Sequence, residues 1–158
     1  MAKGIRNSAK ALIIEDGRLL AVKVKEADNR TYYVLPGGWQ REDESLPDAL
    51  SREVVDELGL FVIPEELVFL YESVRGDLYR CVEFVFVCEY IGDMGQMEQH
   101  CGELIEVKWL DIETLLEQPL YPAALRGQIM RFHSGGSYTT YLDFKGTADE
   151  RYRDNIEI

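Results

Sequence analysis

One segment in the first half of the chain constrains the fold most strongly, because it marks both ends of a helix. Ser45 is a good N-cap residue, and Pro47 suits the first helical turn. Asp48 follows the serine by three residues, as in a capping box, and Gly59 fits the position just beyond the last turn. The pattern predicts a helix over residues 46–58.

The same helix concentrates negative charge on one side. Glu53 and Glu57 are four residues apart, and Asp56 lies three residues after Glu53, so these carboxylates occupy one arc of the helix. Arg52 is the only cation between residues 45 and 58. Like charges at this spacing weaken a helix. The helix alone fits either a solvated acidic surface or a site for an external cation such as Mg²⁺ or Mn²⁺, which prefer oxygen ligands.

A double glycine precedes this helix. Gly37 and Gly38 allow close approach of the backbone and expose main-chain carbonyl and amide groups. The loop leads directly into the acidic helix, so backbone and carboxylate oxygens can converge on one metal ion. We expect the glycines to end the preceding strand, which places Trp39 in a loop rather than on a strand.

The rest of the chain alternates between strand and helix patterns. Asp16 and Gly17 are a strong two-residue turn signal between apolar runs, so residues 9–25 predict a hairpin. Other segments predict strands at 32–36, 67–74, 79–91, 106–111 and 138–144, a helical turn at 112–118 and a helix at 121–133. The strand at 79–91 is largely apolar on both faces, which indicates a central strand. This order of elements favours an α+β or layered α/β/α domain.

Composition narrows the class of protein. The length of 158 residues predicts one domain over 1–158, and the apolar content of 46% indicates a globular chain. The net charge of −12 argues against a nucleic-acid duplex as partner, because phosphate binding needs clustered Lys and Arg. No apolar run approaches the ~20 residues that cross a bilayer, and no signal-peptide pattern is present. We therefore expect a cytoplasmic protein without membrane association.

The spacing of the glycine turn and the acidic helix is far more specific than either alone. It resembles the Nudix box, G-x5-E-x7-R-E-U-x-E-E-x-G-U, in which U is a bulky aliphatic residue. The matching residues are Gly38, Glu44, Arg52, Glu53, Val54, Glu57, Gly59 and Leu60. Asp56 is the one departure, since the family usually has glutamate at this position. The resemblance implies a mixed sheet flanked by helices, as an α/β/α sandwich.

The resemblance also implies roles for residues in the box. Glu53 and Glu57 would be the main ligands of Mg²⁺ or Mn²⁺, with the carbonyl of Gly37 as a further ligand and Asp56 as a weaker or water-mediated one. Glu44 would lie near the metal ions. Arg52 would orient the carboxylates of the loop and helix by charge-assisted hydrogen bonds.

The general base has several candidates. Family members take it from the box helix or from a glutamate on a later loop. The candidates here are Glu53 and three glutamates around the polar loop that precedes Trp109: Glu98, Glu103 and Glu106. Among the loop residues we favour Glu103, because it lies near the start of the next strand.

The implied activity is metal-dependent hydrolysis of a phosphoanhydride in a nucleoside diphosphate linked to another group, such as an ADP-ribose-like compound. The alternative is a catalytically silent module that binds a nucleotide for regulation. For the substrate we expect stacking on Trp39 and phosphate contacts from Arg75 or Arg80. Other aromatic candidates for stacking are Tyr32, Tyr33, Tyr79 and Phe84. A C-terminal tail at about 134–158 is expected to be flexible or to form a homodimer.

Overall fold

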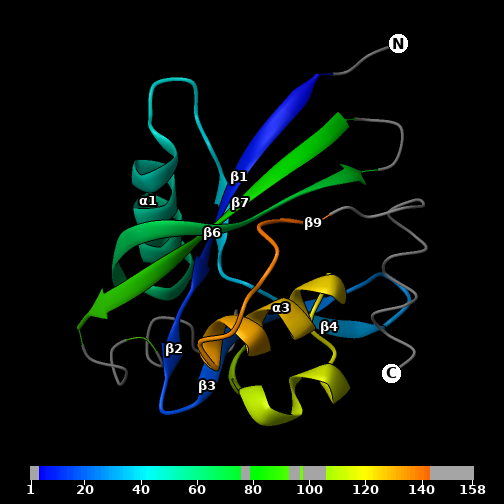
Figure 1. Ribbon diagram of the computed structural model, residues 1–158. Helices are drawn as coiled ribbons and strands as arrows, with labels where there is room; N and C mark the ends of the chain where they lie inside the picture. Colours follow the sequence, from blue (N-terminus) through cyan, green and yellow to red (C-terminus); the bar gives the residue numbers. More distant parts are fainter. Residues whose placement is uncertain (1–3, 76–78, 93–96, 98–105, 143–158) are drawn as a thin grey trace.

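The computed structural model describes residues 4–75, 79–92, 97 and 106–142 and contains two β-sheets (Figure 1). The first sheet has five strands in the order β5 (Gly37–Trp39), β1 (Ile5–Leu12), β7 (Tyr79–Ile91), β6 (Phe61–Arg75) and β9 (Tyr141–Leu142). β1 runs parallel to β7, and β6 runs parallel to β9, whereas the other pairs are antiparallel. The first sheet is therefore mixed.

The second sheet is antiparallel and is built around β3 (Arg18–Lys25). The strands β2 (Ile14–Glu15), β4 (Thr31–Val34) and β8 (Val107–Asp111) all pair with β3. β2 and β3 form a hairpin whose turn residues, Asp16 and Gly17, have φ angles of 51° and 72°. Both values lie in the left-handed region that a tight two-residue hairpin requires, which confirms the predicted turn.

The helices cover the first sheet on opposite faces. α1 (Leu46–Leu58) lies on the face where Ala9 and Ala11 of β1 and Phe86 of β7 are buried (Figure 1). On the other face, the second sheet, the 3-10 helix η1 (Ile112–Glu117) and α3 (Ala124–His133) enclose a core that contains Phe69 and Val85. This arrangement confirms the predicted α+β class, with a mixed sheet between helical layers.

The boundaries of α1 agree with the prediction. The Asp48 amide donates a hydrogen bond of 3.2 Å to Ser45 Oγ at the N-terminus. Gly59 ends the helix with a φ of 65°, a left-handed conformation that glycine adopts without strain. Leu50, Val54 and Leu58 are buried on the sheet. The packing of these residues therefore fixes the position of the acidic side of α1 at the edge of the sheet.

Three predictions about strands need correction. The strand predicted at 32–36 ends before Gly37, as β4 does at Val34, but Gly37 and Gly38 then form a new strand, β5, with Trp39. This strand pairs with Lys10, Ala9 and Ser8 of β1. Trp39 therefore lies on a strand and not in a loop. The strand predicted at 67–74 begins earlier, at Phe61, because register shifts on either side of Leu67 accommodate Pro64 within β6. Of the strand predicted at 138–144, the described residues contain only Tyr141–Leu142.

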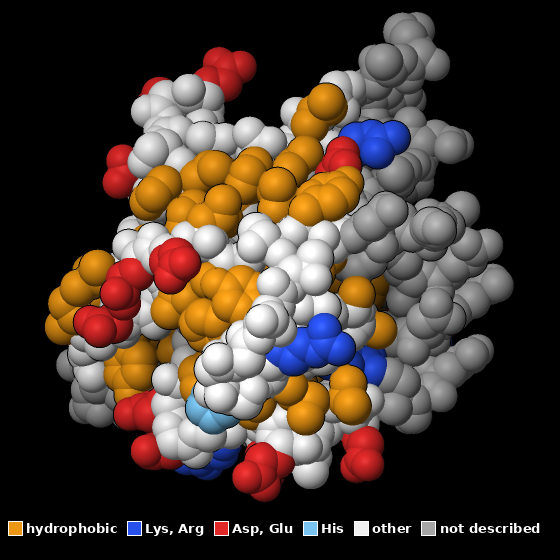
Figure 2. All heavy atoms as spheres, viewed as in Figure 1, with side chains coloured by type: hydrophobic (Ala, Val, Ile, Leu, Met, Phe, Trp, Pro, Cys, Tyr) orange, Lys and Arg blue, Asp and Glu red, His pale blue; other side chains and the backbone are white. Residues whose placement is uncertain are grey.

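Part of the surface on the face shown in Figure 2 is apolar, with acidic side chains around it. Large exposed apolar side chains of the described residues include Phe61, Ile63 and Leu67 on β6 and Ile91 on β7. The predicted homodimer stays a prediction, as do the single domain over 1–158 and the role of its tail, whose residues 143–158 lie outside the described part. No helix among the described residues has the length and apolar character needed to span a bilayer.

Candidate active site

The strand β5, which contains Gly37 and Gly38, approaches the acidic helix α1 closely. A Cβ atom at Gly38 would lie 2.5 Å from Glu53 Oε2 and 2.6 Å from Glu53 Cδ, so the glutamate fills the space that a side chain would need. Gly37 has a φ of 140°, and a Cβ there would lie 2.0 Å from the carbonyl oxygen of Ala9. Only glycine fits at Gly37, whereas a side chain at Gly38 would have to displace Glu53. The absence of a side chain at Gly38 lets Glu53 lie against the backbone of β5.

Glu57 lies one turn after Glu53 and is half-buried. The Gly37 amide donates a hydrogen bond of 3.4 Å to Glu57 Oε1. Burial raises the pKa of Glu57, and the charge of Glu53 adds to this, while the charge of Lys10 and the Gly37 hydrogen bond act in the opposite direction. A carboxylate in such surroundings is stabilised in its charged form by a nearby cation.

Arg52 joins the loop to the helix through several hydrogen bonds. Its Nε and Nη2 atoms donate to the two carboxylate oxygens of Glu44 at 3.0 and 2.6 Å, a bidentate pair. Nη1 donates to Glu53 Oε1 at 2.7 Å, and Nη2 also donates to the Trp39 carbonyl at 2.9 Å. The hydrogen bonds from Arg52 lower the pKa of Glu44 to about 2, and those to Glu44 and Glu53 raise the pKa of Arg52. This geometry suits a residue that orients carboxylates.

Asp56 is placed differently from the two glutamates. Its side chain is 63% exposed, and its Oδ2 lies 3.8 Å from Arg52 Nη1. A weak or water-mediated role at the metal site is compatible with this outward position, and it stays a prediction.

The oxygen atoms near β5 have the chemistry that Mg²⁺ and Mn²⁺ prefer. Glu53 and Glu57 supply carboxylates, and the carbonyl of Gly37 belongs to the same strand that they approach. Among the described residues, no three His, Cys, Asp or Glu side chains are grouped so as to hold a metal ion by themselves. Burial raises the pKa of the half-buried Glu57, and a bound cation would lower it again.

The other predicted site residues are not all brought to this place. The Arg6 guanidinium lies 4.1 Å from the centre of the Trp39 ring, so this ring has a cationic neighbour in the protein itself. Arg80 is exposed and lies 3.6 Å from Glu72. Arg80 pairs with Ile5 of β1, whereas Gly37 pairs with Lys10 of the same strand. Ile5 and Lys10 are five residues apart, so Arg80 lies roughly 16 Å from Gly37 in the direction of the strand.

The loop glutamates and Arg75 are only partly described. Glu98 and Glu103 lie outside the described residues, as does the side chain of Arg75 at the end of β6. Glu106 is exposed and forms an ion pair of 3.1 Å with Lys23. The role of Glu103 as general base and that of Arg75 in substrate binding stay predictions.

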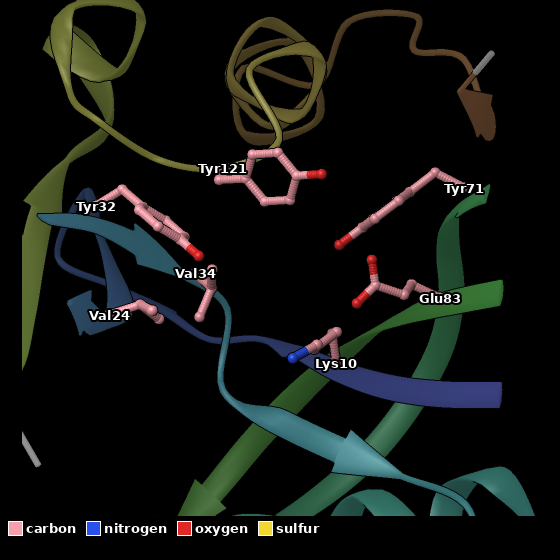
Figure 3. A pocket seen from close by; sticks show the side chains of 7 residues that line it. All are labelled: Lys10, Val24, Tyr32, Val34, Tyr71, Glu83 and Tyr121. Carbon is pink, nitrogen blue, oxygen red and sulfur yellow. The ribbon is translucent and has the colours of Figure 1, made fainter. Parts of the chain in front are cut away.

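A pocket of about 180 Å³ lies between the two sheets (Figure 3). Its lining residues are Lys10, Val24, Tyr32, Val34, Tyr71, Glu83 and Tyr121. Of these, sequence reasoning named only Tyr32 as a candidate for substrate stacking. For the other lining residues, the sequence contains one indication, which is the carboxylate of Glu83 on a strand that is otherwise largely apolar. Lys10 lines the pocket and also influences Glu57, so the pocket adjoins the acidic site.

Comparisons with known proteins agree with this geometry. A family model for the NUDIX domain matches residues 5–131. A MutT-like protein of Streptomyces ambofaciens is 33% identical over 135 residues, which cover 80% of this chain and 82% of the relative. The crystal structure of a MutT protein from Methanosarcina mazei Go1 is 25% identical, with a TM-score of 0.63 over 85% of this chain and 97% of that one.

An ADP-ribose pyrophosphatase from Streptococcus suis shares the fold, with 23% identity and a TM-score of 0.62 over 87% of this chain and 98% of that one. The family match covers most of the chain, and the S. ambofaciens relative aligns over most of its own length. The chain therefore belongs to the Nudix family and is a hydrolase that acts on phosphoanhydride bonds.

Proposed function

We propose that this hydrolase cleaves the phosphoanhydride of a nucleoside diphosphate linked to another group, with Mg²⁺ or Mn²⁺ as cofactor. The observation that carries the proposal is the approach of Glu53 and Glu57 to the glycine strand, where a half-buried carboxylate has a raised pKa. An ADP-ribose-like compound is one candidate substrate, and ADP-ribose also appears in the name of the S. suis protein of the same fold.

Glu53, Glu57 and the Gly37 carbonyl would hold the metal, and Asp56 would contribute weakly from the rim. A divalent cation bound there would neutralise phosphate charge and lower the pKa of a water molecule. The residues of the chain position the reactants. Arg52 keeps Glu53 and Glu44 in fixed orientations, which is the kind of preorganisation that phosphoryl transfer depends on.

In the proposed reaction, the oxygen of water bonds to one phosphorus atom, and the bond between that phosphorus and the bridging oxygen breaks. The water loses its protons to a general base, for which we propose Glu103, and to solvent. The products are a nucleoside monophosphate and the phosphate ester of the attached group.

The test is hydrolysis of a panel of nucleotides with Mg²⁺ or Mn²⁺ by the wild-type protein and by Glu53→Gln. The panel contains ADP-ribose, nucleoside diphosphate sugars, dinucleoside polyphosphates and nucleoside triphosphates. Glu42→Gln is the matched control, because Glu42 is an exposed carboxylate in the loop that leads into α1. We expect turnover of diphosphate derivatives by the wild type and the control and its loss in Glu53→Gln.

Binding of Mn²⁺, followed by electron paramagnetic resonance, should weaken in Glu53→Gln and in Glu57→Gln but not in Glu42→Gln. Full turnover by Glu53→Gln, or unchanged Mn²⁺ binding in both variants, would show that the metal is held elsewhere. Binding of nucleotides without turnover by the wild type would favour a regulatory module. For the base, loss of activity in Glu98→Gln but not in Glu103→Gln would reverse our assignment.

A further inference from the structure

The pocket between the sheets has one polar side and one apolar, aromatic side. The second sheet supplies Val24 from β3 and Tyr32 and Val34 from β4, and Tyr121 closes the pocket from the segment after η1 (Figure 3). The rings of Tyr32 and Tyr121 lie edge to face, with centroids 5.9 Å apart. The first sheet supplies the polar side. Such a division suits a flat ring that is apolar on its faces and polar on one edge.

The polar side is formed by neighbours in the sheet. Tyr71 of β6 and Glu83 of β7 are directly opposite one another, so their side chains leave the sheet on the same face. The Tyr71 hydroxyl points at the Glu83 carboxylate (Figure 3). Burial, followed by the charge of Glu83, raises the pKa of Tyr71, so Tyr71 remains a hydrogen-bond donor.

Glu83 is buried, with only 4% of its surface exposed. Among the described residues, no Lys, Arg or His forms an ion pair with it. A buried carboxylate without a cation is costly unless its oxygens accept further hydrogen bonds. The Tyr71 hydroxyl can supply only one of the roughly four hydrogen bonds that the two oxygens of this carboxylate can accept. A ligand with adjacent N–H groups would supply others.

Lys10 supplies the complementary group at the end of the pocket nearest the metal site. It lies two residues after Ser8, the β1 partner of Glu83, and therefore leaves the strand on the same face as Glu83. It is also opposite Gly37 in the pairing of β1 with β5. An ammonium group can only donate hydrogen bonds, whereas a carboxylate can only accept them. The pocket thus presents an acceptor and a donor side by side.

We propose that this pocket receives the base of the substrate nucleotide and selects a guanine-type ring. The Glu83 carboxylate accepts hydrogen bonds from the N1–H and the 2-amino group of guanine, and Lys10 donates to O6, which is adjacent to N1. Adenine offers the carboxylate only its 6-amino group, because its N1 is an acceptor, and it has no carbonyl oxygen for Lys10. The proposal rests on the proposed function, since it places the nucleotide's phosphates at the neighbouring acidic site.

The size of the pocket agrees with a single base. Pockets for drug-sized ligands usually enclose about 300–1,000 Å³. A volume of about 180 Å³ therefore holds one ring system rather than a whole nucleotide, and the ribose and phosphates would extend past Lys10 toward Glu57.

The test measures binding and turnover separately. Dissociation constants for GMP, IMP and AMP are determined without metal by titration calorimetry. The proteins compared are the wild type, Glu83→Gln and the control Glu89→Gln, an exposed glutamate on the same strand. One bidentate contact to a base discriminates by roughly tenfold or more. We expect GMP to bind about tenfold tighter than AMP, IMP to lie between them because it lacks the 2-amino group, and Glu83→Gln to abolish the preference.

Turnover of GDP-glucose and ADP-glucose with Mg²⁺ then separates the two proposals. Hydrolysis of both at equal kcat/KM, with equal binding of GMP and AMP, would refute the guanine pocket and leave the hydrolase standing. Preferred binding of GMP that depends on Glu83, without turnover of either sugar nucleotide, would refute the proposed function and leave the pocket standing. Absence of GMP binding would also refute the pocket. If Glu83→Gln does not fold, Lys10→Met decides, because it should reduce the preference for GMP as well.

Discussion

Replacement of Gly38 by alanine should remove most of the activity while leaving the protein folded. The added Cβ would lie 2.5 Å from Glu53 Oε2, 2.6 Å from its Cδ and 2.9 Å from its Cγ. All three atoms belong to one flexible side chain, and the φ angle of Gly38 is one that other residues adopt. Glu53 will therefore move, and the backbone of β5 will remain in place.

The structure sets the size of both effects. Carbon and oxygen atoms at 2.5–2.6 Å are about 1 Å closer than the ~3.5 Å at which such contacts become favourable, so the Glu53 carboxylate must move by about 1 Å. A misplacement of this size at an active site reduces the rate by about 10²-fold. Forcing a side chain away from its preferred rotamer costs about 0.5–1.5 kcal/mol, which corresponds to a decrease in Tm of roughly 1–6 °C.

The assay combines kcat/KM on the best substrate with Tm from calorimetry for three glycine variants. Gly37→Ala should be the unstable one, because its Cβ would lie 2.0 Å from the Ala9 carbonyl oxygen at a φ of 140°. Gly127→Ala in α3 is the control, since among the described residues its Cβ would contact Leu116 alone, at 4.0 Å, and it should raise stability by about 0.5–1 kcal/mol. Full activity in Gly38→Ala would refute the reasoning that the position of Glu53 depends on this glycine.

Three further predictions concern charge, reach and packing. Hydrogen bonding to Arg52 lowers the pKa of Glu44 from 4.5 to about 2. Their pairing therefore stabilises the fold above pH 4.5, and this stabilisation is lost as the pH falls through about 2. In Glu44→Gln, the Tm measured over this range should depend less on pH. Asp56→Glu should change kcat/KM by no more than about twofold, because Asp56 is exposed. A large gain in the kcat/KM of this variant, measured as a function of Mg²⁺, would show that the natural aspartate impairs the site. Leu50→Ala should lower stability by about 2–5 kcal/mol in thermal unfolding, since Leu50 of α1 is fully buried between this helix and the sheet, and a loss below about 1 kcal/mol would contradict this packing.

Local signals in the sequence were sufficient where the structure depends on neighbouring residues. The helix at 46–58 was predictable because its N-cap, its first-turn proline and its C-terminal glycine act within a few residues of each other. The hairpin turn at Asp16 and Gly17 is equally local. The family pattern in the box supplied the candidate metal ligands, since Glu53 and Glu57 must share one side of any helix that contains both. Trp39 was misplaced because the pairing of β5 with β1, which lies much earlier in the chain, has no local signal.

The pocket was decided only by the tertiary structure. Lys10, Tyr71, Glu83 and Tyr121 lie far apart in the sequence, and the register of β1, β6 and β7 brings the first three to one face. A shift of one residue in the β6–β7 pairing would turn Glu83 away from Tyr71, and the same shift in the β1–β7 pairing would turn it away from Lys10, because side chains alternate between the two faces of a strand. The sequence by itself thus determined the acidic helix and the reaction class, because both depend on short-range spacing. The neighbouring pocket depends on long-range strand register, which no single segment of the chain encodes.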